Sequence, residues 1–413
     1  MSDNPFARPG VPLRSLAMTV YAPTFLFAVG QGAVIPILAL AARDLGASIP
    51  AAAVIVAMRG IGAMASDIPA GMIIGRLGER RAMSIGTGVL ILSLLGAVWS
   101  SNPIAFGAFI FLMGSGWSVW LLARLAYVTD VVPLQLRGRA LSTMGGMNRI
   151  GNFIGPFLGA ILIAVIGING TFYLHMVFAV AGWLVLLLVP DPHSVPHMPE
   201  EVPVRFRAIL SEHASVFATA GAAALSVGML RSAREAALPL WGEYIGLDAA
   251  LVAVIFGISS GIDMLLFYPA GSASDRFGRK FVAIPCISIM AAGFILLPMT
   301  SSFLAMALVG LVLGFGNGLG SGIIMTLGAD FSPSRGRAEF LGVWRTLGDV
   351  GNAIGPAIVS AVTALASLAA GSLVIGGMGL LGAALVLFRM PEPLKEQLES
   401  ARERRQGGNM PDA

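Results

Sequence analysis

Ten charged side chains lie inside otherwise apolar stretches of the 413-residue sequence, and their residue types suit binding or proton transfer. They are Arg59, Arg124, Arg149, Arg231, Arg234, Arg345, Asp67, Glu235, Asp263 and Asp349. A charge at the middle of a membrane helix costs roughly 2.5 to 3.5 kcal/mol on insertion scales, so such groups face a cavity or one another. If the stretches are membrane helices, these residues are expected to line a pathway for a polar substrate or an ion.

Two pairs among them could neutralise each other along one helix. Arg231 and Glu235 are four residues apart, as are Arg345 and Asp349. Residues at that spacing are neighbours on a helix face. The alternative is that these side chains bind a substrate or an ion, and the spacing does not decide between the two roles.

A proton-coupled reaction needs a carboxyl group or a histidine that gains and loses a proton, and burial favours the neutral form of a carboxyl group. Asp263 and Glu235 are the first candidates. Asp67 lies closer to a charged loop, so a gating or structural role is expected there. For His175 a hydrogen-bonded or membrane-edge position is expected, and a role in proton coupling is the alternative.

The composition identifies the environment of these charges. Hydrophobic residues make up 56% of the chain, charged residues only 12%, and the mean hydropathy is +0.83. Soluble domains carry about a quarter charged residues, so lipid must cover most of this surface. One cysteine excludes an intramolecular disulfide framework, and the four histidines are too widely separated for a metal site, so no cofactor is expected.

Twelve apolar stretches approach the roughly 20 residues that a membrane-spanning helix needs. They lie near residues 16–41, 49–74, 82–99, 103–129, 141–166, 171–190, 214–241, 249–274, 281–300, 303–329, 340–365 and 369–389. The predicted fold class is an all-α membrane protein. A signal peptide is the alternative for the first stretch, but that stretch is long and lacks a convincing cleavage site.

Basic residues gather in alternate connections between the stretches. They are Arg76, Arg80 and Arg81; Arg137 and Arg139; Arg205 and Arg207; Arg276, Arg279 and Lys280; and Arg335 and Arg337. Because Lys and Arg are enriched in cytoplasmic loops, these connections and both termini are expected in the cytoplasm, with the chain in the inner (plasma) membrane. The net charge of +4 is therefore a topology signal and not a nucleic-acid-binding surface.

The two halves of the sequence repeat each other at an offset of 200 residues. The matching sets are Pro69, Ala70, Gly71, Arg76 and Gly78 with Pro269, Ala270, Gly271, Arg276 and Gly278; Asp130 with Asp330; and Gly151, Asn152, Gly155 and Pro156 with Gly351, Asn352, Gly355 and Pro356. Matching elements separated by an even number of spans predict two six-helix halves of the same orientation, with the substrate site between them. The expected parts are an N-terminal half at 1–190, a cytoplasmic linker at 191–213, a C-terminal half at 214–390 and a cytoplasmic tail at 391–413.

The loops after the second and eighth stretches resemble the signature G-x-x-x-D-R-x-G-R-[RK] of the major facilitator superfamily. The second copy, residues 271–280, matches in full, whereas the first has Gly75 and Glu79 in place of the Asp and the first Arg of the closing pair. Residues 151–160 in the fifth stretch also resemble a motif of the twelve-span drug:proton antiporters, so the sequence is similar to that group within the family. The resemblance covers nearly the whole chain and implies the major facilitator fold, with two pseudo-symmetric six-helix halves.

The resemblance also implies a role for these loops. In the family the loop latches the cytoplasmic side through charge pairs, and Asp130 and Asp330 are the natural partners here. The residues expected in this cytoplasmic latch are Asp67, Gly71, Arg76, Gly78, Arg80, Asp130, Gly271, Asp275, Arg276, Gly278, Arg279 and Asp330. The alternative is that these charges only orient the chain in the membrane.

The fifth stretch carries a second family feature, because residues 151–160 resemble the antiporter motif G-x-x-x-G-P-x-x-G-G except at the last position. Pro156 cannot donate a hydrogen bond to the carbonyl of Asn152, so the helix is expected to kink there. Helix hinges are expected at Gly155, Pro156, Gly355 and Pro356. Ordinary packing of small residues is the alternative.

These features predict a proton-coupled secondary transporter that exports a small amphiphilic or organic-anion substrate by alternating access, as a monomer. Trp120 and Trp241 are the aromatic candidates in its pathway, although Trp also favours membrane interfaces. The six arginines outnumber the four acids, which favours an anionic substrate over a lipophilic cation.

A proton-coupled uptake permease is the main alternative, because both kinds of transporter share this fold. A membrane enzyme would need a catalytic constellation in a loop, and a channel would need a filter segment or a repeated ring of charges. Neither is found in the sequence, nor is the Walker A pattern of an ATP-driven transporter. The protein is therefore not expected to be an enzyme.

Overall fold

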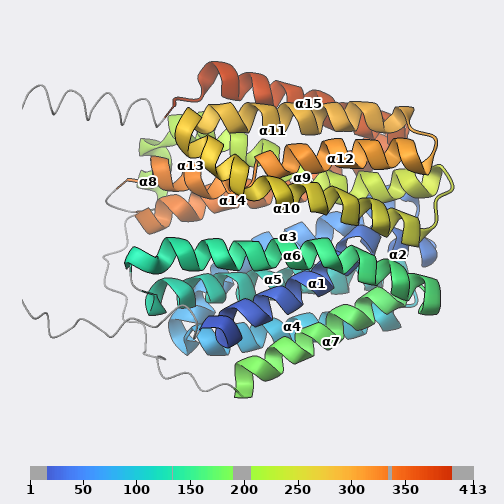
Figure 1. Ribbon diagram of the computed structural model, residues 1–413, viewed down its shortest axis with the longest axis horizontal. Coiled ribbons are helices and arrows are strands. Elements are labelled where there is room, and N and C mark those ends of the chain that lie inside the picture. Colours follow the sequence, from blue (N-terminus) through green and yellow to red (C-terminus); the bar gives the residue numbers. More distant parts are fainter. Residues whose placement is uncertain (1–15, 133, 189–205, 334–336, 393–413) are drawn as a thin grey trace, which may run out of the picture. The chain divides into compact units, whose positions relative to one another are not determined.

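The computed structural model describes residues 16–132, 134–188, 206–333 and 337–392, and the regular elements in those ranges are all helices (Figure 1). In chain order they are η2 (Ala17–Tyr21), α1 (Ala22–Val34), η3 (Ile35–Ile37), α2 (Leu38–Asp44), α3 (Ile49–Leu77), α4 (Glu79–Trp99), α5 (Pro103–Val131), α6 (Leu134–Ile166), α7 (Asn169–Leu188), α8 (Phe206–Glu212), α9 (Ala214–Tyr244), α10 (Ala249–Phe277), α11 (Arg279–Leu296), η4 (Leu297–Met299), α12 (Phe303–Leu319), α13 (Ile323–Phe331), α14 (Arg337–Leu365) and α15 (Leu368–Arg389). The predicted all-α fold class is confirmed.

Eleven helical segments of the described residues are long and apolar enough to cross a membrane. α14 has the length of a span and takes the place of the predicted eleventh one, although Arg345 and Asp349 lower its hydropathy. Each of the twelve predicted stretches thus corresponds to a helical segment. α6 begins at Leu134, seven residues before the predicted apolar stretch near residues 141–166. Arg137 and Arg139 end the apolar stretch but not the helix, since charged residues are compatible with a helix that extends beyond the lipid.

The described residues form two compact units. The N-terminal unit holds the described part of residues 1–200 together with Gly242–Ser260, and the C-terminal unit holds the described parts of residues 201–241 and 261–413. In the N-terminal unit α5 packs against α3 and α4, and α1 packs against α6 and α7. In the C-terminal unit α15 packs against α11 and α14, and α12 packs against α11. Most of the expected linker and tail lies outside the described residues.

The helix bounds follow the same offset as the sequence repeat. α3 and α10 begin and end 200 residues apart, as do α5 and the segment formed by α12 and α13. Gly78 and Gly278, which precede α4 and α11, both have positive φ values, of 81° and 103°. Glycine adopts this conformation without a steric penalty. Residues 200 positions apart can therefore be compared as equivalents.

Two spans are interrupted within their length. In the first, the 3₁₀ turn η3 contains Pro36, which has no amide hydrogen for the preceding turn. In the tenth, α12 ends at Leu319 and α13 begins at Ile323, with Gly322 in the left-handed region at φ 81°. Such a break frees backbone carbonyls, which must find partners inside the protein. The equivalent helix α5 is continuous.

Small residues bring α6 close to α1 and α14 close to α9. A Cβ atom at Gly155 would lie 2.3 Å from the Val29 carbonyl oxygen, and one at Gly355 would lie 2.3 Å from that of Met229. Both prolines beside these glycines lie inside continuous helices. The geometry supports close packing as the role of the glycines, and hinge motion at Pro156 stays a prediction.

Candidate functional site

A polar network joins the interrupted tenth span of the C-terminal unit to two other helices. Asp263 of α10 accepts hydrogen bonds from Asn317 Nδ2 (2.9 Å) and Ser321 Oγ (3.2 Å). Arg231 of α9 donates from Nε to Asn317 Oδ1 (2.6 Å) and from Nη2 to the Gly320 carbonyl (2.9 Å). Arg231 thus binds a carbonyl at the break, and Asn317 links this arginine to Asp263.

Two further charges belong to this network. The guanidinium of Arg234 is attracted electrostatically by Asp263 and Glu235 and repelled by Arg231. Two arginines and two acids therefore balance here, and all four side chains are half-buried. The sequence identified these four residues but not their neutral partners, which lie in the glycine-rich stretch 314–322. A glycine-interrupted apolar run is the signal that could have located them.

The remaining candidates of the C-terminal unit lie apart from this network in the chain. Arg345 and Asp349 form an ion pair along α14, with 3.4 Å between Nε and Oδ2. Trp241 at the end of α9 is buried and donates from Nε1 to Thr300 Oγ1 (2.9 Å). That bond ties α9 to the segment that follows η4.

In the N-terminal unit, Arg124 of α5 is only 4% exposed. Its Nη1 donates to Thr24 Oγ1 (2.9 Å), and its guanidinium lies 4.2 Å from the centre of the Trp120 ring. Trp120 stacks on Phe27, with 4.3 Å between ring centroids. Arg124 Nε has no hydrogen-bond partner among the described residues. A hydroxyl group and an aromatic ring stabilise this cation only partly, so its burial without a carboxylate is costly.

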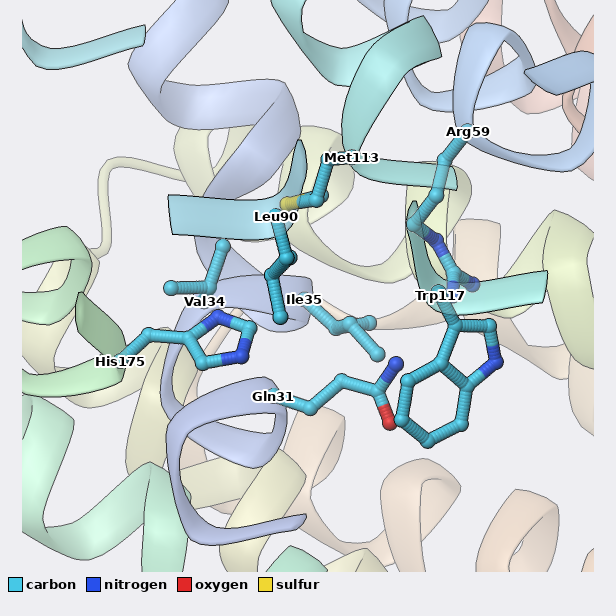
Figure 2. Close-up of a pocket in the computed structure, with 8 residues that line it drawn as sticks. All are labelled: Gln31, Val34, Ile35, Arg59, Leu90, Met113, Trp117 and His175. Atoms are coloured by element: carbon cyan, nitrogen blue, oxygen red, sulfur yellow. The ribbon is translucent and has the colours of Figure 1, made fainter. Parts of the chain in front are cut away.

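A small cavity lies in the same unit between α1, η3, α3, α4, α5 and α7 (Figure 2). Its polar lining is Gln31, Arg59, Trp117 and His175, and its apolar lining is Val34, Ile35, Leu90 and Met113. Its volume of about 10 Å³ is at the lower limit of what one water molecule needs.

His175 is 2% exposed, and within the described part of the chain neither of its ring nitrogens is hydrogen-bonded. Of the two roles expected for this histidine, the hydrogen-bonded one is therefore wrong. Gly30 explains the placement, because a Cβ atom at this position would lie 2.3 Å from His175 Cδ2. The ring packs directly against the backbone of α1, where helical carbonyls and amides already bind each other.

Near the start of α11, Arg279 is held by two carboxylates of its own unit. It donates from Nε to Asp330 Oδ2 and from Nη1 to Asp275 Oδ1, both at 2.7 Å. The side chain of Asp275 is 73% exposed and that of Asp330 20%. Glu392 accepts a hydrogen bond from the Arg279 amide (2.8 Å), which places an anion at the positive N-terminus of α11.

Basic residues at the start of α4 and of α11 bind the last helix of their own half, α7 and α15 respectively. Arg80 Nε donates to the Leu186 carbonyl of α7 (3.0 Å), and Lys280 Nζ donates to the Leu387 carbonyl of α15 (3.2 Å). These contacts satisfy carbonyls at the negative ends of the helices.

Several other predicted residues lie on α3, α5, α6 and α10. Asp67 accepts a hydrogen bond from Ser118 Oγ of α5. Arg149 of α6 is half-buried. The other predicted latch residues are exposed or half-buried: Gly71, Arg76, Asp130, Gly271 and Arg276.

Long apolar helices, a repeat of their bounds and buried charges inside the helical units define a multi-pass membrane protein with internal polar sites. Sequence comparison matches residues 21–267 and 220–408 to the Major Facilitator Superfamily. The chain belongs to this family of transporters.

Relatives within the family include proteins named for multidrug resistance. The multidrug resistance protein MdtG of Proteus mirabilis is 30% identical over 164 residues, which is 39% of this chain and 41% of that protein. An uncharacterized MFS-type transporter of Methanocaldococcus jannaschii is 21% identical over 83% of this chain and 90% of its own length. The match thus spans less than half of the MdtG protein.

Solved structures agree with the fold over nearly the whole chain. A D-xylose-proton symporter aligns with a TM-score of 0.71 at 16% identity and covers 92% of this chain and 98% of its own. A POT family transporter in complex with a thioalcohol-conjugated peptide aligns with a TM-score of 0.77 at 14% identity, covering 91% and 95%. At these identities the likeness concerns the fold, and the predicted major facilitator fold is confirmed.

Proposed function

We propose that the protein is a proton-coupled secondary transporter of the inner membrane that exports a small amphiphilic or organic-anion substrate by alternating access, with both termini in the cytoplasm. The multidrug resistance protein of Proteus mirabilis, to which part of the chain is similar, supports export. The D-xylose-proton symporter that shares the fold supports proton coupling. The basic residues of the alternate loops support the orientation.

The environment of Arg124 is the observation that best supports an anionic substrate. This guanidinium is buried against Thr24 and Trp120, and the described residues offer it no carboxylate. A buried cation without a counter-charge is destabilising unless a ligand supplies one. A carboxylate or phosphate group complements a guanidinium with two parallel hydrogen bonds.

The distribution of charge between the units supports the same conclusion. Among the ten charged residues expected in the spans, the C-terminal unit has Arg231, Arg234 and Arg345 against Glu235, Asp263 and Asp349. The N-terminal unit has Arg59, Arg124 and Arg149 against Asp67 alone. The formal excess of two positive charges therefore belongs to the N-terminal unit, which is where we expect an anion to bind.

Asp263 is the carboxylate that we propose for proton coupling. Its oxygens accept hydrogen bonds from Asn317 and Ser321, which both belong to the interrupted span. Its negative charge also attracts the guanidinium of Arg234. Protonation of Asp263 would remove its attraction for Arg234 and loosen this network. A change of charge at a helix break is a suitable trigger for a conformational step.

Transport in proteoliposomes with an imposed pH gradient tests the proposal. The substrates would be an organic acid, a neutral drug and a lipophilic cation, each assayed with the gradient in both directions and after its collapse by a protonophore. Proton-driven exchange of the acid supports the proposal. Movement of the acid together with protons in the same direction would favour the uptake permease, and transport of the cation alone would overturn the anionic substrate.

A further inference from the structure

The tenth span and its repeat equivalent have the same bounds but different backbones. α5 (Pro103–Val131) is a continuous helix, whereas α12 and α13 cover the same positions 200 residues later with an interruption. Three glycines of the interruption stand where α5 has larger residues. They are Gly318, Gly320 and Gly322, in place of Ser118, Trp120 and Leu122. Because glycine weakens a helix without preventing it, this stretch is suited to both an interrupted and a continuous form.

The backbone hydrogen bonds at the break are shorter in sequence than those of an α-helix. In an α-helix each carbonyl accepts from the amide four residues on. Here the Ser321 amide donates to the Gly318 carbonyl (3.1 Å), and the Gly320 carbonyl accepts from the Ile323 amide (3.2 Å), so both bonds join residues three apart. The carbonyls at the break can therefore accept other donors.

Arg231 of α9 is such a donor. Its Nη2 donates to the Gly320 carbonyl (2.9 Å) and lies 3.5 Å from the Asn317 carbonyl oxygen, while its Nε donates to Asn317 Oδ1 (2.6 Å). The cation thus lies at the C-terminal end of α12, where the helix dipole is negative. The N-terminal unit has the neutral Gln31 at the equivalent position, beside a helix that is continuous.

Asp263 of α10 orients the groups that Arg231 binds. Its Oδ2 accepts from Asn317 Nδ2 (2.9 Å), which turns the amide oxygen of Asn317 towards Arg231. Its Oδ1 accepts from Ser321 Oγ (3.2 Å). A protonated carboxyl group has less capacity to accept, so protonation of Asp263 would remove the preference for this amide orientation.

The other titratable groups around Asp263 come from two helices. Arg234 and Glu235 belong to α9, and Arg234 is attracted by both acids and repelled by Arg231. Cys286 belongs to α11, and its thiol interacts electrostatically with Arg231 and Asp263. Because Asp263 itself holds two residues of the tenth span, its charge is the one that acts on the break.

We infer that the tenth span switches between an interrupted and a continuous helix, and that Arg231 is the positioning residue that holds the interrupted form while Asp263 is ionised. Protonation of Asp263 releases Arg231, and the freed carbonyls then accept from the amides four residues on, as those of α5 do. The inference rests on the proposed function in that Asp263 binds the coupling proton.

α13 transmits this change to the end of the span. Its Asp330 accepts a hydrogen bond from Arg279 of α11 (2.7 Å), and its Ile324 carbonyl accepts one from Trp344 Nε1 of α14 (2.7 Å). A straightened span redirects α13 and so breaks or rearranges both bonds. A proton at Asp263 is thereby linked to the charge pair at the start of α11.

Hydrogen exchange of the purified full-length protein in lipid nanodiscs tests the inference without any gradient or transport. Amides of an interrupted helix exchange faster than those of a continuous one, and residues 118–124 of α5 are the internal reference. We expect Asp263→Asn, a neutral side chain of the same shape, to raise the protection of residues 318–324 by about tenfold or more and to leave the reference unchanged. Asp275→Asn removes an exposed carboxylate from the same helix and should change neither segment by more than about twofold.

Two further variants act on the break itself. Arg231→Gln introduces the residue of the equivalent position and should also raise the protection of residues 318–324. Gly322→Ala keeps every charge, so it remains informative if Arg231→Gln does not fold. A Cβ atom at Gly322 meets nothing within 4 Å, but its φ of 81° disfavours alanine, so the substitution penalises the interrupted form and should raise protection. Gly342→Ala in α14, where a Cβ atom also meets nothing within 4 Å, is the matched control.

The pH dependence separates a proton switch from a structural role. After division by the intrinsic exchange rates, the protection of residues 318–324 in the wild-type protein should rise as the pH falls, because protonation favours the continuous helix. In Asp263→Asn it should not change with pH. Protection that is independent of pH in the wild-type protein, or that is not raised in Asp263→Asn and Gly322→Ala, would overturn the inference.

The outcomes also distinguish this inference from the proposed function. If protection changes as expected but collapse of the pH gradient leaves transport in proteoliposomes unaffected, the switch stands and the proposed proton coupling fails. If transport is proton-driven and Asp263→Asn abolishes it without a change in protection, the function stands and the switch is wrong.

Discussion

Arg43 and Glu243 occupy equivalent positions of the 200-residue repeat and form an ion pair with each other, with Arg43 Nε 3.0 Å from Glu243 Oε1 and 3.1 Å from Oε2. Both residues belong to the N-terminal unit, Arg43 near the end of α2 and Glu243 near the end of α9. A buried apolar cluster of the same unit contains Ile37 and Leu40 of the first span and Val252 of α10. The two copies of the repeat thus carry opposite charges at one position, and the fold brings these charges into contact.

Charge reversal tests whether this pair stabilises the contact between the ends of α2 and α9. The side chains are about one-third exposed, so the pair is expected to contribute roughly 0.2 to 1 kcal/mol. Arg43→Glu or Glu243→Arg alone places like charges together and should lower the thermal unfolding midpoint and the transport rate. The double exchange restores opposite charges and should recover both. A double variant no better than the worse single one would show that the two residues are not coupled.

The contacts of Arg279 predict unequal effects at its two carboxylates. Asp330 is largely buried and Asp275 largely exposed, although both lie 2.7 Å from the guanidinium. Asp330→Asn should therefore reduce transport more than Asp275→Asn does, because an exposed ion pair is worth at most about 1 kcal/mol. Transport rates in proteoliposomes, normalised to the amount of inserted protein, measure the difference. Equal wild-type rates in both variants would leave these charges with the role of orienting the chain.

The sequence predicted the helices well because one physical property, the length of apolar stretches, determines them. It predicted the charged members of the candidate sites for the same reason, since a charge in an apolar stretch is conspicuous. Neutral partners such as Thr24 and Asn317 could not be separated from other polar residues of the helices, because a neutral polar side chain in an apolar stretch is less conspicuous than a charged one. Their roles depend on which helix faces meet.

His175 shows the same limit more sharply. Its missing hydrogen bonds follow from its position against Gly30 of α1, which the sequence around residue 175 does not specify. The count of six arginines and four acids was available from the sequence. Only the structure shows that these charges balance in the C-terminal unit and leave a positive excess in the N-terminal unit.

The packing of α6 on α1 predicts a contrast between two glycine substitutions. Gly155→Ala would place a Cβ atom 2.3 Å from the Val29 carbonyl, so the helices must separate at a cost of roughly 1 to 3 kcal/mol. Gly71→Ala is the matched control, because a Cβ atom there meets nothing within 4 Å and alanine favours the helix. Thermal unfolding in detergent should show a lower midpoint for the first variant and an unchanged or higher one for the second. Similar midpoints for both would argue against close packing as the role of the motif.

Pro156→Ala separates packing from hinge motion at the same site. Alanine can donate the missing hydrogen bond to the Asn152 carbonyl, so α6 should become straighter and stiffer. We expect the variant to retain its affinity for substrate, and either its transport turnover falls or substrate leaks through the protein without coupled exchange. If the variant has the turnover of the wild-type protein and shows no additional leakage, Pro156 serves packing and not hinge motion.

Arg124 and Arg234 provide the most direct test of the charge of the transported substrate. Arg124 is buried against a hydroxyl group and an aromatic ring, whereas Arg234 is near Asp263 and Glu235. Replacing either arginine by Gln removes one positive charge, but only at Arg124 is a destabilising, uncompensated charge removed. Arg124→Gln should therefore keep or raise the thermal midpoint, and Arg234→Gln should lower it by leaving two acids with one arginine.

Arg124→Gln should lose transport of an acidic substrate by about tenfold or more in kcat/KM, since a guanidinium–carboxylate bond is worth about 1.5 to 3 kcal/mol, and it should retain transport of any lipophilic cation that the wild-type protein carries. Arg234→Gln should lower proton-driven transport of every substrate, because it disturbs the Asp263 network that we propose for proton coupling. Parallel assays of one organic acid and one cation in the same proteoliposomes measure the ratio directly, so that differences in insertion cancel. If Arg124→Gln loses cation efflux and the wild-type protein never transports an acid, the charge argument is wrong, and the protein is a cation exporter in which Arg124 serves the conformational cycle.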